Sequence, residues 1–228
     1  MRAGLAAALL VIGLGGCGGT PTSSVREGAL RYVALGDSYT IGTSVSSAES
    51  WPSQLVARVA DLELVANLGV NGYSTDDLIV EALPKVGGLE PEFVTLLVGV
   101  NDVVRGMPEQ RYAANLVLIL DELLGQLPAD RILCVATPDY TVTPQGAAFG
   151  SPDEQRAGIV RFNRRLGEVC EARGIRFMPE IFEISEAAAT DRSLVADDGL
   201  HPSGAQYALW VDAIQPVVED LLLPSADR

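Results

Sequence analysis

The sequence is poor in the residues from which many nucleic-acid and metal sites are built. It contains one lysine, Lys85, one histidine, His201, and three cysteines. Acidic residues outnumber basic residues by 30 to 16, so the formal net charge is -14 at pH 7. A phosphate backbone is bound by clustered Lys and Arg, and this balance argues against a nucleic-acid partner. A histidine-based zinc site and a lysine-containing phosphate loop are also implausible, so we expect no metal and no cofactor.

The N-terminal apolar run is too short to cross a membrane. It extends from Leu5 to Leu14, whereas a membrane-spanning helix needs ~20 residues. The run follows Arg2 and has the length of an export signal. It ends in Leu14-Gly15-Gly16-Cys17, which resembles a bacterial lipobox, where the cysteine is lipidated and becomes the mature N-terminus. This pattern predicts a lipid anchor on Cys17, and the alternative is an ordinary signal peptide that contains a cysteine.

These features predict three segments along the chain. A lipoprotein signal peptide covers residues 1–16, a flexible tether rich in Gly, Ser, Thr and Pro covers 17–28, and one folded domain covers 29–228. The composition, 48% hydrophobic and 20% charged, is typical of a globular domain with a full core. We therefore expect an exported monomer that its lipid anchors to the membrane surface of the bacterial cell envelope.

Two cysteines fall inside the predicted domain. Cys134 lies in the apolar run RILCVA, and Cys170 lies in a helical segment. An exported protein is permitted a disulfide. Both positions are typical of buried residues, however, and we favour two free thiols over a bridge.

Short apolar runs alternate with longer helical segments along the domain. The expected strands are 30–35, 62–67, 93–99, 131–136 and 175–179, and the expected helices lie near 50–61, 74–86, 108–126, 153–173 and 203–223. The strands are mainly apolar, which suits parallel strands that are covered on both faces. The alternation predicts an α/β fold, a three-layer α/β/α sandwich around a mostly five-stranded parallel sheet.

Chemically active residue types stand just beyond the expected strands. Ser38 follows the first strand in Gly-Asp-Ser, Gly72 lies beyond the second, and Asn101 follows the third in Gly-Val-Asn-Asp. Asp198 and His201 precede the last helix. Because ligands of open α/β sheets bind beyond the carboxyl ends of the strands, we expect these five residues to converge on one rim.

This set of residue types suits acyl transfer. A serine hydroxyl is a weak nucleophile until a base removes its proton, and neutral imidazole does so near neutral pH. A carboxylate fixes the imidazole tautomer and stabilises the imidazolium. The developing oxyanion needs preorganised donors, which the Ser38 and Gly72 amides and the Asn101 side chain could supply.

Together the four stretches resemble the SGNH, or GDSL, hydrolases, whose blocks are a Gly-Asp-Ser turn, an oxyanion glycine, Gly-x-Asn-Asp and Asp-x-x-His. All four blocks occur here in order, between residues 36 and 201. The resemblance is to a lysophospholipase-like and esterase-like branch, and it implies a flavodoxin-like SGNH fold. It also implies a serine esterase in which Ser38 is the nucleophile, His201 the general base and Asp198 the acid that orients it. Gly72 and Asn101 would bind the oxyanion together with the Ser38 amide.

Each block alone is a weak signal, and other interpretations accompany it. A Gly-Asp-Ser turn is by default a surface turn, but the conjunction of all blocks with the only histidine favours catalysis. Asp197 is an alternative to Asp198, although the Asp-x-x-His spacing favours Asp198. Asp37 and Asp102 are expected to bond turn amides behind the site. The α/β-hydrolase elbow Gly-x-Ser-x-Gly is excluded because position 40 is Thr.

The expected substrate is a small ester, with a short acyl or acetyl group, and lysophospholipid is a further candidate. The long loop 137–152, which contains Tyr140 and Phe149, is either a lid over the acyl pocket or a solvated connection. Two other functions stay open. One is an envelope O-acyltransferase that uses the same triad, and the other is a non-catalytic envelope binding protein.

Overall fold

The computed structural model describes residues 28–223. The predicted signal peptide, the lipidation site Cys17 and all but the last residue of the predicted tether lie outside the described residues. The domain predicted over 29–228 is described as far as residue 223.

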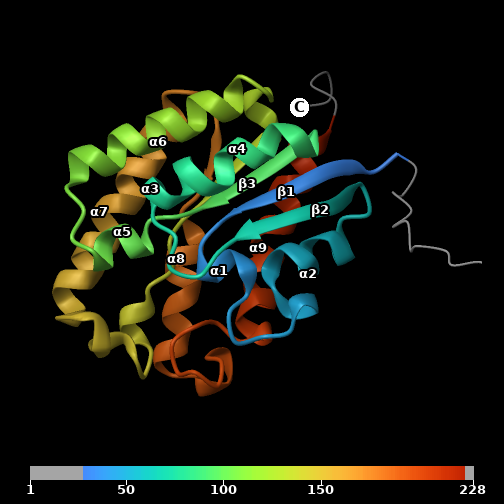
Figure 1. Cartoon of the computed structure of the whole chain (residues 1–228). Coiled ribbons are helices and arrows are strands. Elements are labelled where there is room, and N and C mark those ends of the chain that lie inside the picture. The colour runs from blue at the N-terminus through green and yellow to red at the C-terminus, as the bar shows by residue number, and fades with distance from the viewer. Residues whose placement is uncertain (1–27, 224–228) are drawn as a thin grey trace, which may run out of the picture.

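Five parallel strands form one sheet in the order β2-β1-β3-β4-β5. The strands are β1 (Leu30–Gly36), β2 (Leu62–Gly69), β3 (Phe93–Leu97), β4 (Ile132–Val135) and β5 (Arg176–Met178). Each lies within one or two residues of its predicted position. The sheet is central, with helices above and below it (Figure 1), so the predicted three-layer α/β/α fold is confirmed.

The helices fall at the five predicted places and at three others. They are α1 (Ser38–Ile41), α2 (Trp51–Arg58), α3 (Thr75–Asp77), α4 (Leu83–Val86), α5 (Val100–Val104), α6 (Glu109–Leu124), α7 (Pro152–Glu171), α8 (Glu180–Ser185) and α9 (Gly204–Leu222). The sequence analysis missed α1, α5 and α8, because helices of six residues or fewer are too short to show a helical period.

The single helix predicted near 74–86 is in fact interrupted. A π-helical turn, Leu78–Ala82, separates α3 from α4. Within that turn the Leu83 amide donates to the Leu78 carbonyl, and the next residue is Pro84. Proline has no amide hydrogen with which to continue the α-helical pattern, and its ring crowds the preceding turn. A wider turn before Pro84 satisfies these constraints.

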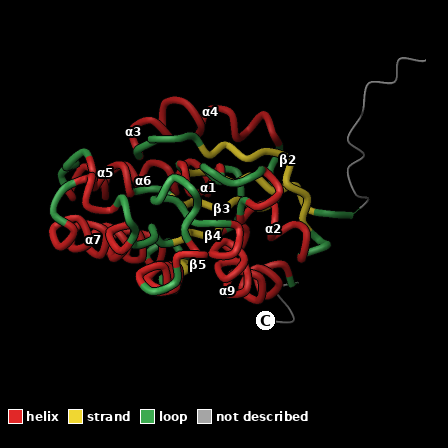
Figure 2. Tube along the Cα trace, turned by 90° about the horizontal axis from the view of Figure 1, so that it is seen from below, coloured by secondary structure: helices red, strands yellow, loops and turns green. Residues whose placement is uncertain are grey.

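Two hydrophobic clusters lie on opposite faces of the sheet. Alternate side chains of β1 supply both, with Tyr32 and Ala34 in one cluster and Val33 and Leu35 in the other. The first cluster joins the sheet to α2, α8 and α9 through residues such as Trp51, Ile181 and Trp210. The second joins it to α4, α6 and α7 through Val86, Leu116 and Phe162. Figure 2 shows α4 and α9 on opposite sides of the strands.

The strand order places a functional site at the ends of β1 and β3. After β1 the chain forms β2 on one side, and after β2 it crosses back to form β3 on the other side of β1. At such a switch point the loops after the two central strands diverge and leave a crevice for a ligand. The loop after β1 begins with Asp37 and Ser38, and the loop after β3 leads into α5, which contains Asn101.

Cys134 and Cys170 are both buried as free thiols, as favoured from the sequence. Burial and the neighbouring Cys170 thiol raise the pKa of Cys134 well above its ordinary value. A thiol that stays protonated is a poor nucleophile, so Cys134 fits a packing role between β4 and α7.

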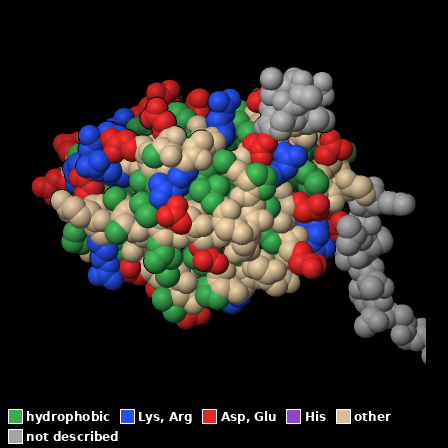
Figure 3. All heavy atoms as spheres, turned by 90° about the horizontal axis from the view of Figure 1, so that it is seen from above, with side chains coloured by type: hydrophobic (Ala, Val, Ile, Leu, Met, Phe, Trp, Pro, Cys, Tyr) green, Lys and Arg blue, Asp and Glu red, His purple; other side chains and the backbone are tan. Residues whose placement is uncertain are grey.

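The surface mixes acidic and basic side chains. On the face that Figure 3 shows, Asp and Glu lie beside Arg side chains rather than in one patch. Ion pairs of this kind include Arg111 with Asp76 and Arg105 with Asp77. No helix within residues 28–223 is both long enough and apolar enough to cross a membrane.

Candidate active site

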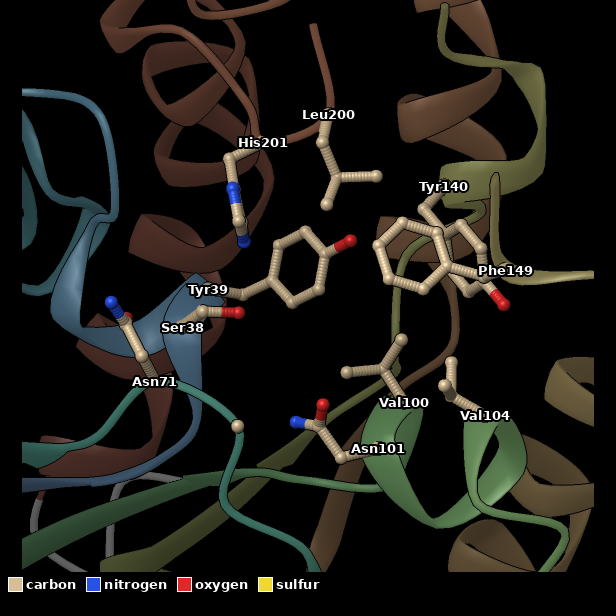
Figure 4. A pocket seen from close by; sticks show the side chains of 11 residues that line it. Ser38, Tyr39, Asn71, Val100, Asn101, Val104, Tyr140, Phe149, Leu200 and His201 are labelled. Atoms are coloured by element: carbon tan, nitrogen blue, oxygen red, sulfur yellow. The ribbon is translucent and has the colours of Figure 1, made fainter. Parts of the chain in front are cut away.

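One pocket brings four of the five predicted site residues together. Its cavity of about 200 Å³ lies beyond the carboxyl ends of β1 and β3. The polar part of its lining consists of Ser38, Asn71, Gly72, Asn101 and His201, and the apolar part of Tyr39, Val100, Val104, Tyr140, Phe149 and Leu200. Figure 4 shows these side chains around the cavity. The fifth predicted residue, Asp198, contacts His201 directly.

Ser38 stands on a sharp turn between β1 and α1. Asp37 caps the helix, because its Oδ1 accepts a hydrogen bond of 3.0 Å from the Tyr39 amide. Ser38 is the first residue of α1, so its amide precedes the hydrogen bonds that the helix makes within itself. The residue is 7% exposed, and this exposure is toward the pocket that it lines.

The Asp198 carboxylate holds His201 through both of its oxygens. Oδ1 accepts the amides of Leu200 and His201, each at 2.9 Å. Oδ2 lies 2.6 Å from His201 Nδ1. Asp197, the alternative acid, is exposed, and the carboxylate against the ring is that of Asp198.

Asp198 is ionised over the whole physiological range. Its burial acts to raise its pKa, but hydrogen bonds from Ser44, from the His201 ring and from two backbone amides outweigh burial. The pKa of Asp198 is therefore held well below its usual value. An ionised carboxylate at Nδ1 requires that nitrogen to carry a hydrogen, which leaves Nε2 of neutral His201 as the proton acceptor.

The imidazole of His201 is packed between its acid and an aromatic ring. The Tyr39 ring centroid lies 5.4 Å from that of His201, and Tyr39 in turn packs against Trp210. In Figure 4, His201 points from its loop toward Ser38 and Tyr39. In the described part of the chain no hydrogen bond joins Ser38 to the ring. Rotation about χ1 between staggered positions changes the distance between the Ser38 hydroxyl and the His201 ring.

Gly72 and Asn101 line the pocket together with Ser38, and Asn101 lies beside Val100 of the apolar lining (Figure 4). The loop at Gly72 turns with a φ of 81°, a conformation that glycine adopts without strain. Two side chains donate hydrogen bonds to carbonyls of this loop. Asn101 Nδ2 donates to the Tyr73 carbonyl at 2.9 Å, and the Arg105 guanidinium donates to the Gly72 carbonyl at 2.7 Å. An amide nitrogen carries two hydrogens, so Asn101 retains a second one for the pocket.

Asp37 and Asp102 lie behind the pocket, as predicted, rather than in it. Asp102 accepts the amide of Thr75 at 3.1 Å and also the Thr75 hydroxyl. Burial raises the pKa of Asp37 to about 8, against the weaker opposing effect of its bond to the Tyr39 amide. Burial raises the pKa of Asp102 as well, although its bonds to Thr75 lower it in part. Both acids serve the backbone of the turns that carry the pocket residues.

The loop 137–152 contributes a wall of the pocket. Tyr140 and Phe149 line the cavity, and their rings meet edge to face with centroids 5.6 Å apart. The Tyr140 hydroxyl donates to Gln155 at 2.7 Å, and the Gln145 amide donates to the Gly199 carbonyl at 2.9 Å. The loop is thus attached to α7 and to the Asp198–His201 segment, and two of its aromatic side chains line the pocket.

Two residues with contacts to this site were missed by sequence reasoning. Ser44 donates to Asp198, and Arg105 holds the loop at Gly72. Neither belongs to a recognisable spacing, because each contact joins segments that are distant in the sequence. Arg105 follows Gly-Val-Asn-Asp closely, which is the one signal that could have pointed to it.

The arrangement is suited to acyl transfer. It offers a hydroxyl, an imidazole–carboxylate pair and amide donors around one cavity. Among the described residues no cluster of three or more His, Cys, Asp or Glu side chains could hold a metal ion.

The sequence matches the model of a known protein family. The sequence model of the GDSL-like Lipase/Acylhydrolase family matches residues 34–209, which include all five predicted site residues. No curated protein sequence matches significantly.

The fold is similar to that of several solved structures. TesA is 20% identical with a TM-score of 0.65, over 84% of this chain and 99% of TesA. A variant of Axe2, an acetyl xylan esterase from Geobacillus stearothermophilus, is 18% identical with a TM-score of 0.65, over 87% and 99% of the two chains. The psychrotrophic esterase EstA from Pseudoalteromonas sp. is 17% identical with a TM-score of 0.63, over 84% and 98%. At these identities the likeness establishes the fold.

Proposed function

The chain belongs to the GDSL-like lipase/acylhydrolase family, a family of carboxylic ester hydrolases, and from that premise we propose that it is a serine esterase with Ser38 as nucleophile. The observation that carries the proposal is the pairing of His201 Nδ1 with Asp198 at 2.6 Å, on the wall of the cavity that Ser38 also lines. A histidine with a purely structural role would not need an ionised carboxylate partner, an edge of the ring open to a pocket, and a serine hydroxyl in that same pocket.

In the first half of the proposed reaction, an ester carbonyl carbon lies next to Ser38 Oγ. The hydroxyl attacks the carbon while its proton passes to His201 Nε2, and Asp198 stabilises the resulting imidazolium. The carbonyl oxygen becomes an oxyanion and accepts hydrogen bonds from the Ser38 and Gly72 amides and the Asn101 side chain. The imidazolium then gives its proton to the departing alcohol oxygen, the C–O bond breaks, and an acyl-serine remains.

In the second half, water takes the place of the alcohol. His201 removes a proton from the water, which attacks the acyl-serine carbonyl, and the same donors stabilise the second oxyanion. Return of the proton to Ser38 Oγ releases the carboxylic acid. Atoms balance as one ester and one water consumed for one acid and one alcohol formed.

The size of the pocket supports a short acyl group. Val100, Val104 and Leu200 give the cavity apolar walls, and Tyr140 and Phe149 line it on the side away from Ser38 (Figure 4). Each buried CH₂ contributes ~0.8 kcal/mol until the cavity is full. We therefore place the substrate among esters with short or acetyl acyl groups. Since a fold neighbour acts on acetyl xylan, acetylated glycans belong among the esters to be tried.

A panel of p-nitrophenyl esters tests the proposal on purified residues 18–228. The wild type should hydrolyse the acetate or butyrate ester, and Ser38→Ala should reduce the rate to the background of the buffer. His201→Asn should lose several orders of magnitude in kcat. Equal activity in Ser38→Ala and wild type would disprove the assignment of Ser38.

We further propose that the protein is a lipoprotein anchored through Cys17 to the cell envelope. The lipobox-like sequence before Cys17 supports this proposal. Wild-type protein should sediment with membranes, and Cys17→Ser should be released into the soluble fraction. A wild type found wholly in the soluble fraction would refute the anchor and leave the esterase proposal untouched.

A further inference from the structure

The segment after α1 connects the nucleophile turn to both of its partner loops. This segment, the strap, consists of Gly42, Thr43 and Ser44. It begins where Gly42 ends α1 with a φ of 81°, and a Cβ on Gly42 would lie 2.6 Å from the Ser50 Cβ. The Gly42 and Thr43 amides both donate to the Ser38 carbonyl at 3.1 Å. The strap therefore starts tightly against the residue proposed as nucleophile.

Ser44 reaches from the strap to the acid of the acid–base pair. Its hydroxyl donates to Asp198 Oδ2 at 2.7 Å, and the same oxygen lies 2.6 Å from His201 Nδ1. The other hydrogen bonds that the structure gives to this carboxylate come from the amides of Leu200 and His201, within its own loop. Ser44 thus supplies the contact that ties the carboxylate to the rest of the molecule.

The backbone at Ser44 adopts a left-handed conformation that such a residue seldom takes. Its φ is 67°, and within residues 28–223 only Glu90 is another non-glycine residue with positive φ. Conformations of this kind cost free energy, and they persist where the surroundings determine them. Here the turn directs the hydroxyl at Asp198. A glycine would be unstrained at this position, so the serine is explained by its side chain rather than by its backbone.

The residue before Ser44 makes the matching contact on the other side of the site. The Thr43 hydroxyl donates to the Asn71 side chain, on the loop that carries Gly72. Three consecutive residues therefore link Ser38, the proposed oxyanion loop and the acid–base loop. Such links maintain the relative positions of groups that must act together within about 0.5 Å.

We propose that Ser44 is a positioning residue for the His201–Asp198 pair, which it serves by fixing Asp198 Oδ2 opposite Nδ1. This inference rests on the proposed esterase function and adds a member to its machinery. The hydroxyl does not touch substrate in this role. Its loss leaves Oδ2 held by the His201 ring alone, so the carboxylate and ring turn more freely and Nε2 spends less time in line with Ser38. The loss should therefore appear in kcat rather than in KM.

The kinetic test uses three single variants. Ser44→Ala removes the hydroxyl and keeps a Cβ, and Ser44→Gly removes the hydroxyl while relieving the backbone. Ser46→Ala is the matched control, because Ser46 lies on the same loop but donates to Glu49. With p-nitrophenyl butyrate, both Ser44 variants should lose roughly tenfold in kcat with KM nearly unchanged, and the control should match the wild type.

Proton NMR provides a readout that does not need turnover. The chain has one histidine, so untagged protein gives one set of imidazole signals. The Nδ1 hydrogen in a short bond to a carboxylate resonates far downfield, and its position depends on the charge at Oδ2. Removal of the Ser44 donor concentrates charge on Oδ2, so this signal should shift in both Ser44 variants and stay in place in Ser46→Ala.

Four results would overturn the proposal. They are wild-type kcat in Ser44→Ala, wild-type kcat in Ser44→Gly, an equal loss in Ser46→Ala, or an unshifted Nδ1 signal in both Ser44 variants. A wild type that hydrolyses no ester would defeat the esterase proposal instead. In that case the NMR comparison still decides whether Ser44 positions the His201–Asp198 pair.

Discussion

The buried carboxyl behind the nucleophile turn should make the stability of the protein depend on pH. Asp37 is fully buried, and burial raises its pKa from 3.8 to about 8. In the unfolded chain the group ionises near its ordinary pKa, whereas in the folded protein it stays protonated up to about pH 8. The stabilisation that protonation gives is therefore complete below the unfolded pKa and is lost as the pH rises toward 8.

Asp37→Asn isolates this effect. Asn resembles the protonated acid in shape, and its oxygen can still accept the Tyr39 amide that Asp37 accepts at 3.0 Å. One pKa unit corresponds to about 1.4 kcal/mol. Between about pH 5 and 7 the free energy of unfolding of the wild type should fall, relative to Asp37→Asn, by about 1.4 kcal/mol per pH unit, or about 3 kcal/mol over the interval.

Urea unfolding monitored by tryptophan fluorescence at several pH values measures this difference directly. Asp61→Asn is the control, since Asp61 is exposed. The stability difference between wild type and Asp61→Asn should change little over the same interval. A difference for Asp37→Asn that is independent of pH would show that Asp37 is ionised in the folded protein, and the reasoning from burial would be refuted.

Three further predictions concern the pocket. Asn101→Ala removes one oxyanion donor and should lower kcat by about 10²–10³-fold in steady-state assays with p-nitrophenyl butyrate, whereas an unchanged kcat would remove Asn101 from the oxyanion site. Phe149→Ala removes an aromatic side chain from the cavity wall and should favour longer acyl chains by up to about fourfold in kcat/KM per added CH₂. Leu118→Ala, at an exposed position on α6, is the control, and an identical chain-length profile in both variants would contradict the assigned wall. Asp198→Asn should be less stable than the wild type at neutral pH in urea unfolding, since the pKa of Asp198 is lowered in the folded state. This difference in the free energy of unfolding should shrink as the pH falls below about 4, and a difference that stays constant would contradict the lowered pKa.

The fold was predictable because its signals are local. Residues 32–35 and 132–136 are continuously apolar, and they are flanked by longer segments with a helical pattern. These features are enough to indicate buried parallel strands. The interruption before Pro84 was less accessible, because the proline marks the place of a break without specifying the π-helical turn that replaces it.

The candidate site was predictable where its residues follow strands. Ser38 and Asn101 stand at the ends of β1 and β3, and a parallel sheet brings such positions to one edge. The Asp198–His201 pair was also accessible, since three residues separate the partners and one loop holds both. Chain order and strand position were sufficient for these residues.

The supporting contacts were not predictable in the same way. Ser44 and Asp198 are 154 positions apart, and no spacing rule connects a serine on one loop to a carboxylate on another. Arg105 reaches the Gly72 carbonyl across 33 positions. Such contacts depend on how loops fold back over the sheet, which the periodicity of strands and helices does not specify.

The most direct test of the central claim is covalent labelling of Ser38. An alkyl phosphonate ester with a good leaving group phosphonylates a serine that an adjacent base activates, and intact-mass spectrometry followed by peptide mapping locates the adduct. The wild type should gain one phosphonyl group on Ser38, and His201→Asn should react much more slowly. An unlabelled wild type, or an adduct on another residue, would contradict the activation of Ser38 by the His201–Asp198 pair.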